Sequence, residues 1–131
     1  MKKYIILIII ILIELFAIKI PNYVELNDLA IIEEIAIEHK SNNYTIILKE
    51  IIPIKADQGI NYEYKYYEES SSTIKKAYKK LTTRTKKKLY LQQVKSLITN
   101  IKSSKNIKNT LNIKPQNIIH TNNVQLTIKD K

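Results

Sequence analysis

The sequence predicts an α+β fold: a small, mostly antiparallel or mixed sheet with one or two helices, preceded by an N-terminal hydrophobic anchor helix. Three observations lead to this prediction. An apolar run follows two lysines at the start of the chain, β-branched and alternating segments fill residues 30–67, and an amphipathic helical pattern occupies residues 74–81. A chain of 131 residues is long enough for one small domain behind a membrane segment.

The N-terminal segment, residues 1–20, has the pattern of a signal peptide or signal anchor. Lys2 and Lys3 precede the unbroken apolar run Tyr4–Ile13, which is ten residues long, and the run continues through Glu14 to Ile18. A span usually needs about 20 apolar residues. No paired small residues mark a cleavage site, so we expect an uncleaved anchor; the alternative is a buried element of a soluble core. The anchoring positions are Tyr4, Ile8, Ile11 and Leu15.

The two lysines also predict an orientation. Positive charge before an apolar segment favours an N-terminus inside the cell. Residues 21–131 would then form a single domain outside the cytoplasm, at the cell membrane or the spore inner membrane.

Residues 21–67 predict the sheet. Pro21 breaks the apolar run. Segments 30–38 and 44–53 are rich in β-branched residues, and residues 40–43 between them contain Asn-Asn, which predicts an antiparallel hairpin. After a polar connection ending at Gly59, segment 60–67 alternates apolar and polar residues and predicts a third strand.

The second half of the chain predicts a helix followed by weaker elements. Ser72 or Thr73 is the expected N-cap of a helix that ends near Thr83. Its apolar face consists of Ile74, Ala77, Tyr78 and Leu81. Segment 89–98 predicts a fourth strand, residues 100–112 a short helix, and segment 124–128, which alternates, a terminal strand.

The order of these segments resembles the N-terminal domain of the Ger(x)C family, the C subunits of bacterial spore germinant receptors. Four stretches carry the resemblance: 25–31, 44–53, 72–81 and 88–98, so that it spans about residues 25–99. The resemblance implies a membrane-attached, non-enzymatic protein that docks on integral-membrane receptor subunits during spore germination. It therefore also implies a function in binding rather than in chemistry.

This sequence departs from the family pattern in three respects. Family members carry a lipidated cysteine followed by Trp-Asp, whereas Lys19, Ile20, Pro21 and Asn22 stand at the corresponding positions. An uncleaved helix would therefore replace the lipid. Glu68-Glu69-Ser70-Ser71 stands where the family has a glycine before its helix. Family members also continue into further domains, so this chain is a truncated copy, a degenerate copy or a stand-alone module.

Composition argues against most catalytic and metal-dependent functions. The chain has no Cys, one Gly and two histidines, which excludes a disulfide scaffold, a thiol nucleophile and a Cys-ligated zinc site. Glu33 and Glu34 point to opposite faces of a strand and form no catalytic pair. We expect His39 and His120 to be solvated surface residues. We therefore expect no catalytic residue, no metal, no cofactor and no small-molecule substrate.

The charge distribution points to a binding surface in the second half of the chain. The net charge is +10; residues 21–69 contain ten acids and four lysines, whereas residues 70–131 contain fifteen bases and one acid. A basic half suits nucleic acid, anionic lipid or an acidic partner, although an AT-rich genome also favours lysine codons. The predicted headgroup or partner contacts are Lys76, Lys80, Arg84, Lys86, Lys87 and Lys88.

A cluster of tyrosines is the other conspicuous feature. Tyr62, Tyr64 and Tyr66 share one face of the third strand, which predicts packing in the core or in an interface rather than stacking on bases. We therefore expect no nucleic-acid partner. Two alternatives remain open: a cytosolic nucleic-acid-binding module that uses the basic half, and a non-functional remnant with too thin a core to fold stably.

Overall fold

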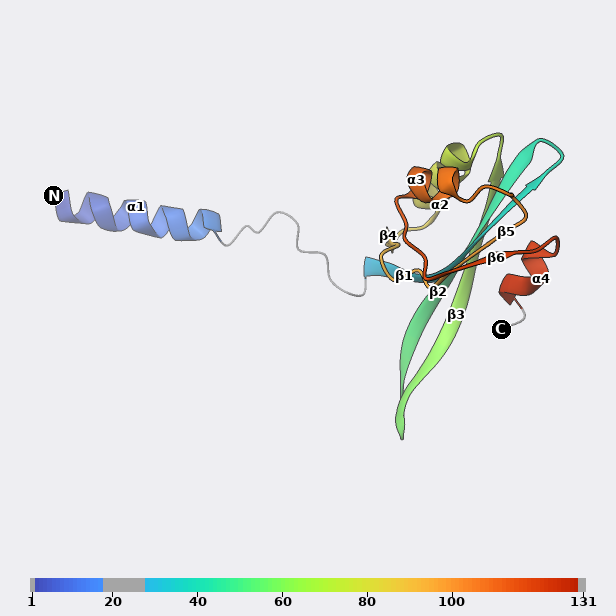
Figure 1. Ribbon diagram of the computed structural model, residues 1–131. Helices are drawn as coiled ribbons and strands as arrows, with labels where there is room; N and C mark the ends of the chain where they lie inside the picture. The colour runs from blue at the N-terminus through green and yellow to red at the C-terminus, as the bar shows by residue number, and fades with distance from the viewer. Residues whose placement is uncertain (1, 18–27, 130–131) are drawn as a thin grey trace.

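The structure, a computed structural model, describes residues 2–17 and 28–129 (Figure 1). The predicted break at Pro21 and the predicted boundary after residue 20 lie outside the described residues. Within them, residues 28–129 form an α+β domain with a mixed sheet, as the sequence predicts.

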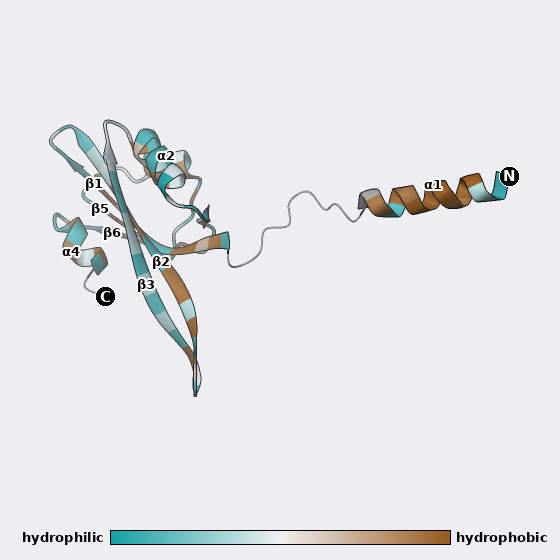
Figure 2. Ribbon diagram, turned by 180° about the vertical axis from the view of Figure 1, so that it is seen from behind, coloured by the Kyte–Doolittle hydropathy of each residue, from teal (hydrophilic) through white to brown (hydrophobic). Residues whose placement is uncertain are grey.

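The N-terminal helix α1 spans Lys2–Ala17, 16 residues. Its apolar side chains from Tyr4 to Leu15 are exposed, including all four predicted anchoring residues, and Figure 2 shows hydrophobic residues along most of its length. Of the helices that the structure describes, none is long and apolar enough to cross a membrane. The described residues therefore do not show a membrane-spanning anchor.

Six strands form the sheet. They are β1 (Leu29–Lys40), β2 (Asn43–Ala56), β3 (Gly59–Ser71), β4 (Lys88–Tyr90), β5 (Ser96–Thr99) and β6 (Asn117–His120). The order is β3-β2-β1-β5-β6, and β4 pairs with the beginning of β1. The predicted hairpin is confirmed: β1 and β2 are antiparallel and joined through Ser41 and Asn42, which both have positive φ. β4, β5 and β6 pair in parallel.

Three helices pack on the sheet, one more than the maximum predicted: α2 (Ile74–Arg84), α3 (Lys105–Leu111) and α4 (Val124–Lys129). Ala77 and Leu81 of α2 and Ile107 of α3 join Ile35 and Leu48 in the larger core cluster. Val124 and Ile128 of α4 pack with Ala36 and Ile47 in a smaller one. Because neighbouring residues of a strand point to opposite faces, α4 covers the face opposite to α2 and α3.

The amphipathic helix follows the prediction closely. Thr73 is its N-cap, and the Thr73 hydroxyl accepts a hydrogen bond from the Lys76 backbone N–H at 3.1 Å. The helix ends at Arg84, one residue beyond the predicted end.

Two strand predictions in the second half of the chain are wrong. Segment 89–98 is not one strand, because a turn at residues 91–95 separates β4 from β5. Segment 124–128 is helix α4, in which Val124 and Ile128 are buried one turn apart while Leu126 is 61% exposed. The strand β6, with the sequence Asn-Ile-Ile-His, was not predicted.

The β2–β3 hairpin extends well beyond the rest of the sheet (Figure 1). Its register is unbroken from Tyr44 opposite Ser71 to Ala56 opposite Gly59. β1 pairs with β2 only as far as Ile32 opposite Glu50, because its register shifts between Ile32 and Glu34 and residues 29–31 pair with β4 instead. We call residues 44–50 and 65–71 the base of the hairpin, and residues 51–56 and 59–64 its arm.

Candidate functional site

Three of the predicted contact residues form one stripe of helix α2. Lys76, Lys80 and Arg84 follow one another at intervals of four residues and therefore lie on one side of the helix. Lys80 Nζ donates to the Ser70 carbonyl at 3.1 Å, and Arg84 donates to the Glu68 carbonyl at 3.2 Å. The stripe thus lies along the outer edge of β3.

A hollow of about 570 Å³ lies beside this stripe. The three cations of the stripe line it together with Glu69, Ser71, Lys79 and Thr83. Glu69 is paired with Arg84 at 2.9 Å, which leaves the lysines to set the charge of the hollow. Helices α2 and α3 together contain seven cations and no acid. This side of the domain therefore suits an acidic ligand.

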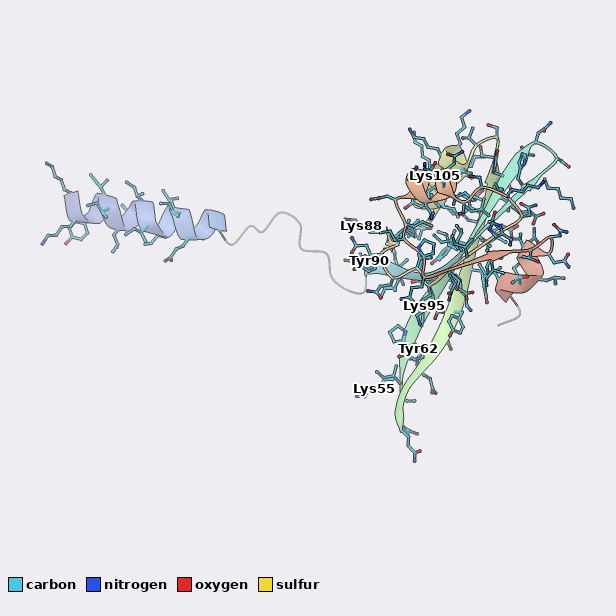
Figure 3. The ribbon with its side chains drawn as sticks, viewed as in Figure 1. Lys55, Tyr62, Lys88, Tyr90, Lys95 and Lys105 are labelled. Atoms are coloured by element: carbon cyan, nitrogen blue, oxygen red, sulfur yellow. The ribbon has the colours of Figure 1, made fainter. Side chains whose placement is uncertain are left out.

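The other three predicted contact residues follow the C-terminal end of α2, between Arg84 and the start of β4. Lys88 begins β4 and stands opposite Leu29, the first residue of β1; Figure 3 shows Lys88 and Tyr90 beside the start of β1. Lys86 and Lys88 are exposed. Lys87, in contrast, is partly exposed, and its Nζ lies 3.2 Å from a carboxylate oxygen of the buried Glu50. The structure therefore gives Lys87 a role in the fold, while contact of the other two with a ligand stays a prediction.

Glu50 is the centre of a buried polar cluster. Its side chain is 2% exposed, and it accepts a hydrogen bond from the Tyr67 hydroxyl at 2.7 Å in addition to the contact with Lys87. Burial, together with the hydrogen bond to Glu50 and the negative charge of Glu50, raises the pKa of Tyr67 to about 12. Each carboxylate oxygen of Glu50 thus has a partner. The contact with Lys87 connects the base of the hairpin to the residue before β4.

The other carboxylates of β1 also belong to ion pairs. Glu34 pairs with Lys49 at 3.5 Å, and Glu33 pairs with Lys95 at 3.3 Å. Lys49 in turn lies over the Tyr64 ring, 4.2 Å from its centroid. The two neighbouring glutamates thus have different partners. His39 is exposed and stacks on Tyr44, and His120 is exposed as well.

The arm carries a surface whose exposure the sequence did not reveal. Ile60, Tyr62 and Tyr64 are 63%, 55% and 42% exposed, and together with Tyr66 they lie on the sheet face that also carries α4. Figure 3 shows Tyr62 and Lys55 on the projecting part of the hairpin. Apolar and polar residues alternate here just as they do in the base, so alternation alone does not distinguish a covered strand from a projecting one.

Comparison with known proteins gives one match. The sequence model described as the spore germination protein N-terminal domain matches residues 22–128. The comparisons with curated proteins and with solved structures gave no match. The matched region contains the whole sheet and helices α2 and α3, so it extends past residue 99, where the recognised resemblance ended. This chain therefore belongs to the family of the spore germination protein N-terminal domain.

Proposed function

We propose that this chain is a non-enzymatic binding subunit that acts in spore germination and is held at a membrane by its apolar N-terminal helix. The observation that carries the proposal is the exposure of α1: its apolar side chains between Tyr4 and Leu15 are about half exposed or more. A continuous apolar surface of this size indicates contact with lipid or with another protein. The family assignment supports the role in germination.

The position of the basic turn supports a defined orientation at the membrane. Lys88 lies beside Leu29, where the chain enters the domain from its N-terminal side. Lys86 and Lys88 are exposed there, and a lysine near an anionic membrane surface contributes about 1 kcal/mol of binding. We infer that this end of the domain contacts anionic headgroups.

The resemblance to germinant receptor C subunits adds a partner to the proposal. The domain would lie on the outer face of the cell membrane or the spore inner membrane, with the N-terminus inside as Lys2 and Lys3 predict. From there it would dock on the integral-membrane subunits of a germinant receptor. The exposed lysines that line the hollow beside α2, Lys76 and Lys79 among them, would contact acidic side chains of such a subunit.

Membrane retention tests the first part of this proposal. The full chain is expressed in a bacterial host, and the membrane fraction is washed with high salt and with carbonate. We expect the intact protein to stay in the membrane and to be digested when protease is added to spheroplasts. Ile11→Lys should release it, because a charge in the middle of an apolar helix costs about 3 kcal/mol. Ile60→Lys should not, although Ile60 of the arm is 63% exposed and Ile11 is 48% exposed.

Recovery of the unaltered chain in the soluble fraction would contradict membrane attachment. If that soluble protein also bound DNA or RNA with steep salt dependence, the nucleic-acid alternative would replace the proposal.

Vesicle binding tests the contact with headgroups. Lys86→Glu with Lys88→Glu should weaken binding to vesicles that contain phosphatidylglycerol at least tenfold, and should leave binding to neutral phosphatidylcholine vesicles unchanged. Lys55→Glu with Lys102→Glu is the matched control, because it makes the same change in net charge at two exposed lysines away from this end of the domain. Equal effects of the two changes would show that net charge, rather than this end of the domain, determines binding.

A further inference from the structure

The outer edge of strand β3 is covered at Glu68 and Ser70 of the base and uncovered from Tyr66 through the arm. In the base, Lys80 and Arg84 of α2 donate hydrogen bonds to the carbonyls of Ser70 and Glu68. From Ile60 to Tyr66, by contrast, no described residue outside β2 hydrogen-bonds to the backbone of β3. An unpaired strand edge of this length is a template on which another strand can pair.

The hydrogen bonds from α2 show which residues of β3 direct their backbone N–H and C=O groups away from β2. Because the carbonyls of Glu68 and Ser70 are reached from outside the sheet, their N–H groups point outward as well, and alternate residues of an antiparallel strand behave alike. Ile60, Tyr62, Tyr64 and Tyr66 therefore also direct their N–H and C=O groups away from β2. The same four residues place their side chains on one face of the sheet.

The other edge of the arm is less suited to strand pairing. The edge of β2 that faces away from β3 contains Pro53, which has no N–H to donate. A partner strand therefore finds a regular ladder on β3 and an interrupted one on β2.

We propose that β3 pairs with β3 of a second copy of this chain, antiparallel and with the twofold axis at Tyr64. In this register Tyr64 stands opposite Tyr64 of the second copy, and Tyr62 stands opposite Tyr66 of the second copy. The outward backbone groups of these residues then form a continuous ladder. Six tyrosines, three from each copy, line one face, where cross-strand aromatic pairs are favourable.

The charges of Glu63 and Lys65 favour this register over the two adjacent registers. With the axis at Tyr64, Glu63 of each copy stands opposite Lys65 of the other, which gives two cross-strand ion pairs. With the axis at Glu63, two glutamates face each other, and with the axis at Lys65, two lysines do. Like charges directly opposite one another destabilise a sheet. The sequence of β3 is therefore complementary to itself in one register only among these three.

The tip of the arm adds a further complementary charge. In the proposed register, Asp57 at the tip of one copy comes opposite Ser71 of the other. Ser71 lines the hollow beside Lys76 and Lys80. The ladder ends before Glu68 and Ser70, whose carbonyls already accept hydrogen bonds from Arg84 and Lys80, and the acidic tip of each copy extends past the ladder toward the basic stripe of the other.

Single cysteines test this register directly, because the chain has none of its own. Tyr64→Cys places two thiols opposite each other, where directly paired residues lie about 5 Å apart and a disulfide can form. The full chain is treated with a mild oxidant at a series of concentrations and its mass is measured. We expect a covalent dimer of twice the chain mass.

Ser70→Cys is the matched control. Residue 70 is also exposed on β3, but in the proposed register the two copies of it lie about 40 Å apart. We expect no dimer from this variant at the concentrations at which Tyr64→Cys is fully linked. Equal linking of the two variants, or no dimer from Tyr64→Cys in a protein whose circular dichroism is unchanged, would overturn the proposal.

Charge exchange provides a second test that needs no cysteine. Glu63→Lys turns both proposed ion pairs into like-charge pairs and should weaken association, measured by sedimentation equilibrium of the full chain, about tenfold. Adding Lys65→Glu to the same chain restores opposite charges and should restore association. If the double variant is as weak as the single one, or if Tyr64→Cys links only to a different protein in the expression host, self-pairing is wrong. None of these outcomes depends on membrane attachment, which the fractionation experiment tests separately.

Discussion

The base and the arm of the β2–β3 hairpin share two strands and one unbroken register, yet their surroundings differ completely. In the base, Ile46, Ile47 and Leu48 are fully buried, α2 covers one face, α4 covers the other, and Glu50 holds Lys87 and Tyr67. In the arm, Ile60, Tyr62 and Tyr64 are exposed on a part of β2 and β3 that pairs with no other described strand. One hairpin thus contributes both to the core and to a free surface, and the register shift in β1 separates the two parts.

Truncation of a core residue should show the largest difference between the two regions. Leu48→Ala removes a fully buried side chain from the base and should lower the free energy of unfolding by about 3 kcal/mol. Ile60→Ala, which truncates an exposed apolar side chain of the arm, should change the free energy of unfolding by less than about 0.5 kcal/mol. Urea unfolding of the full chain in mild detergent, followed by circular dichroism, measures both.

The same unfolding curve tests whether the chain is a folded protein at all. A cooperative transition for the unaltered chain would exclude the remnant alternative. A broad, non-cooperative curve, or equal losses from the two substitutions, would contradict the distinction between base and arm.

Removing a carboxylate should have a smaller effect that differs between the regions in the same way. Glu50→Ala leaves the Tyr67 hydroxyl and Lys87 without their acceptor and should cost about 2 kcal/mol in the same unfolding experiment. Glu63→Ala removes an exposed glutamate of the arm and should be close to neutral in the dilute chain. A comparable loss from Glu63→Ala would mean that the arm contributes to the stability of the single chain.

The basic stripe of α2 should contribute still less to the free energy of unfolding. Arg84→Ala removes the donor that covers the Glu68 carbonyl and an exposed ion pair with Glu69, and should lower the free energy of unfolding by about 0.5 kcal/mol. Lys75→Ala, on the same helix, is the control and should change it less. If both changes are neutral, the contacts of Arg84 with β3 do not stabilise the base.

Alkaline pH above 10 should affect the base through Tyr67; burial also raises the pKa of Tyr78 on α2. Because folding raises the pKa of Tyr67 from 10.0 to about 12, the folded state keeps a proton that the unfolded state loses. The contribution of Tyr67 to stability is thus complete below pH 10 and disappears as the pH rises to about 12. Tyr67→Phe should reduce this decline, and titration of tyrosinate absorbance should lose its step near pH 12. An unchanged step would place the shifted tyrosine elsewhere.

The sequence predicted those elements whose residues determine their own conformation. The Asn-Asn turn and β-branched flanks identified the first hairpin, and Thr73 with the apolar face of residues 74–81 identified α2. Lys76 and Lys80 were predicted on the polar face of this helix, whereas Arg84, which was predicted beyond the helix end near Thr83, completes the basic stripe. Its contact with the β3 edge was not predictable, because that contact depends on how α2 packs.

The elements that were missed depend on distant partners. Residues 89–98 form one continuous strand pattern, but β1 shifts register after Ile32, so β4 and β5 pair with separate parts of it. The alternation of residues 124–128 also places Val124 and Ile128 one helical turn apart, and burial against Ala36 and Ile47 favours the helix. The exposure of the arm depends on where β1 ends its pairing with β2, which the sequence of the arm does not encode.

Amide hydrogen exchange along β2 and β3 tests the division between base and arm most directly. In the dilute chain we expect the amides of Ile46, Ile47 and Leu48 to exchange only through global unfolding, because both neighbouring strands and the core protect them. The amides of Tyr62 and Tyr64, which face outward, should exchange with little protection, and should become protected as the concentration rises and two copies pair. Uniform protection of all five amides at low concentration would show that the arm is covered within the single chain, and would contradict this account.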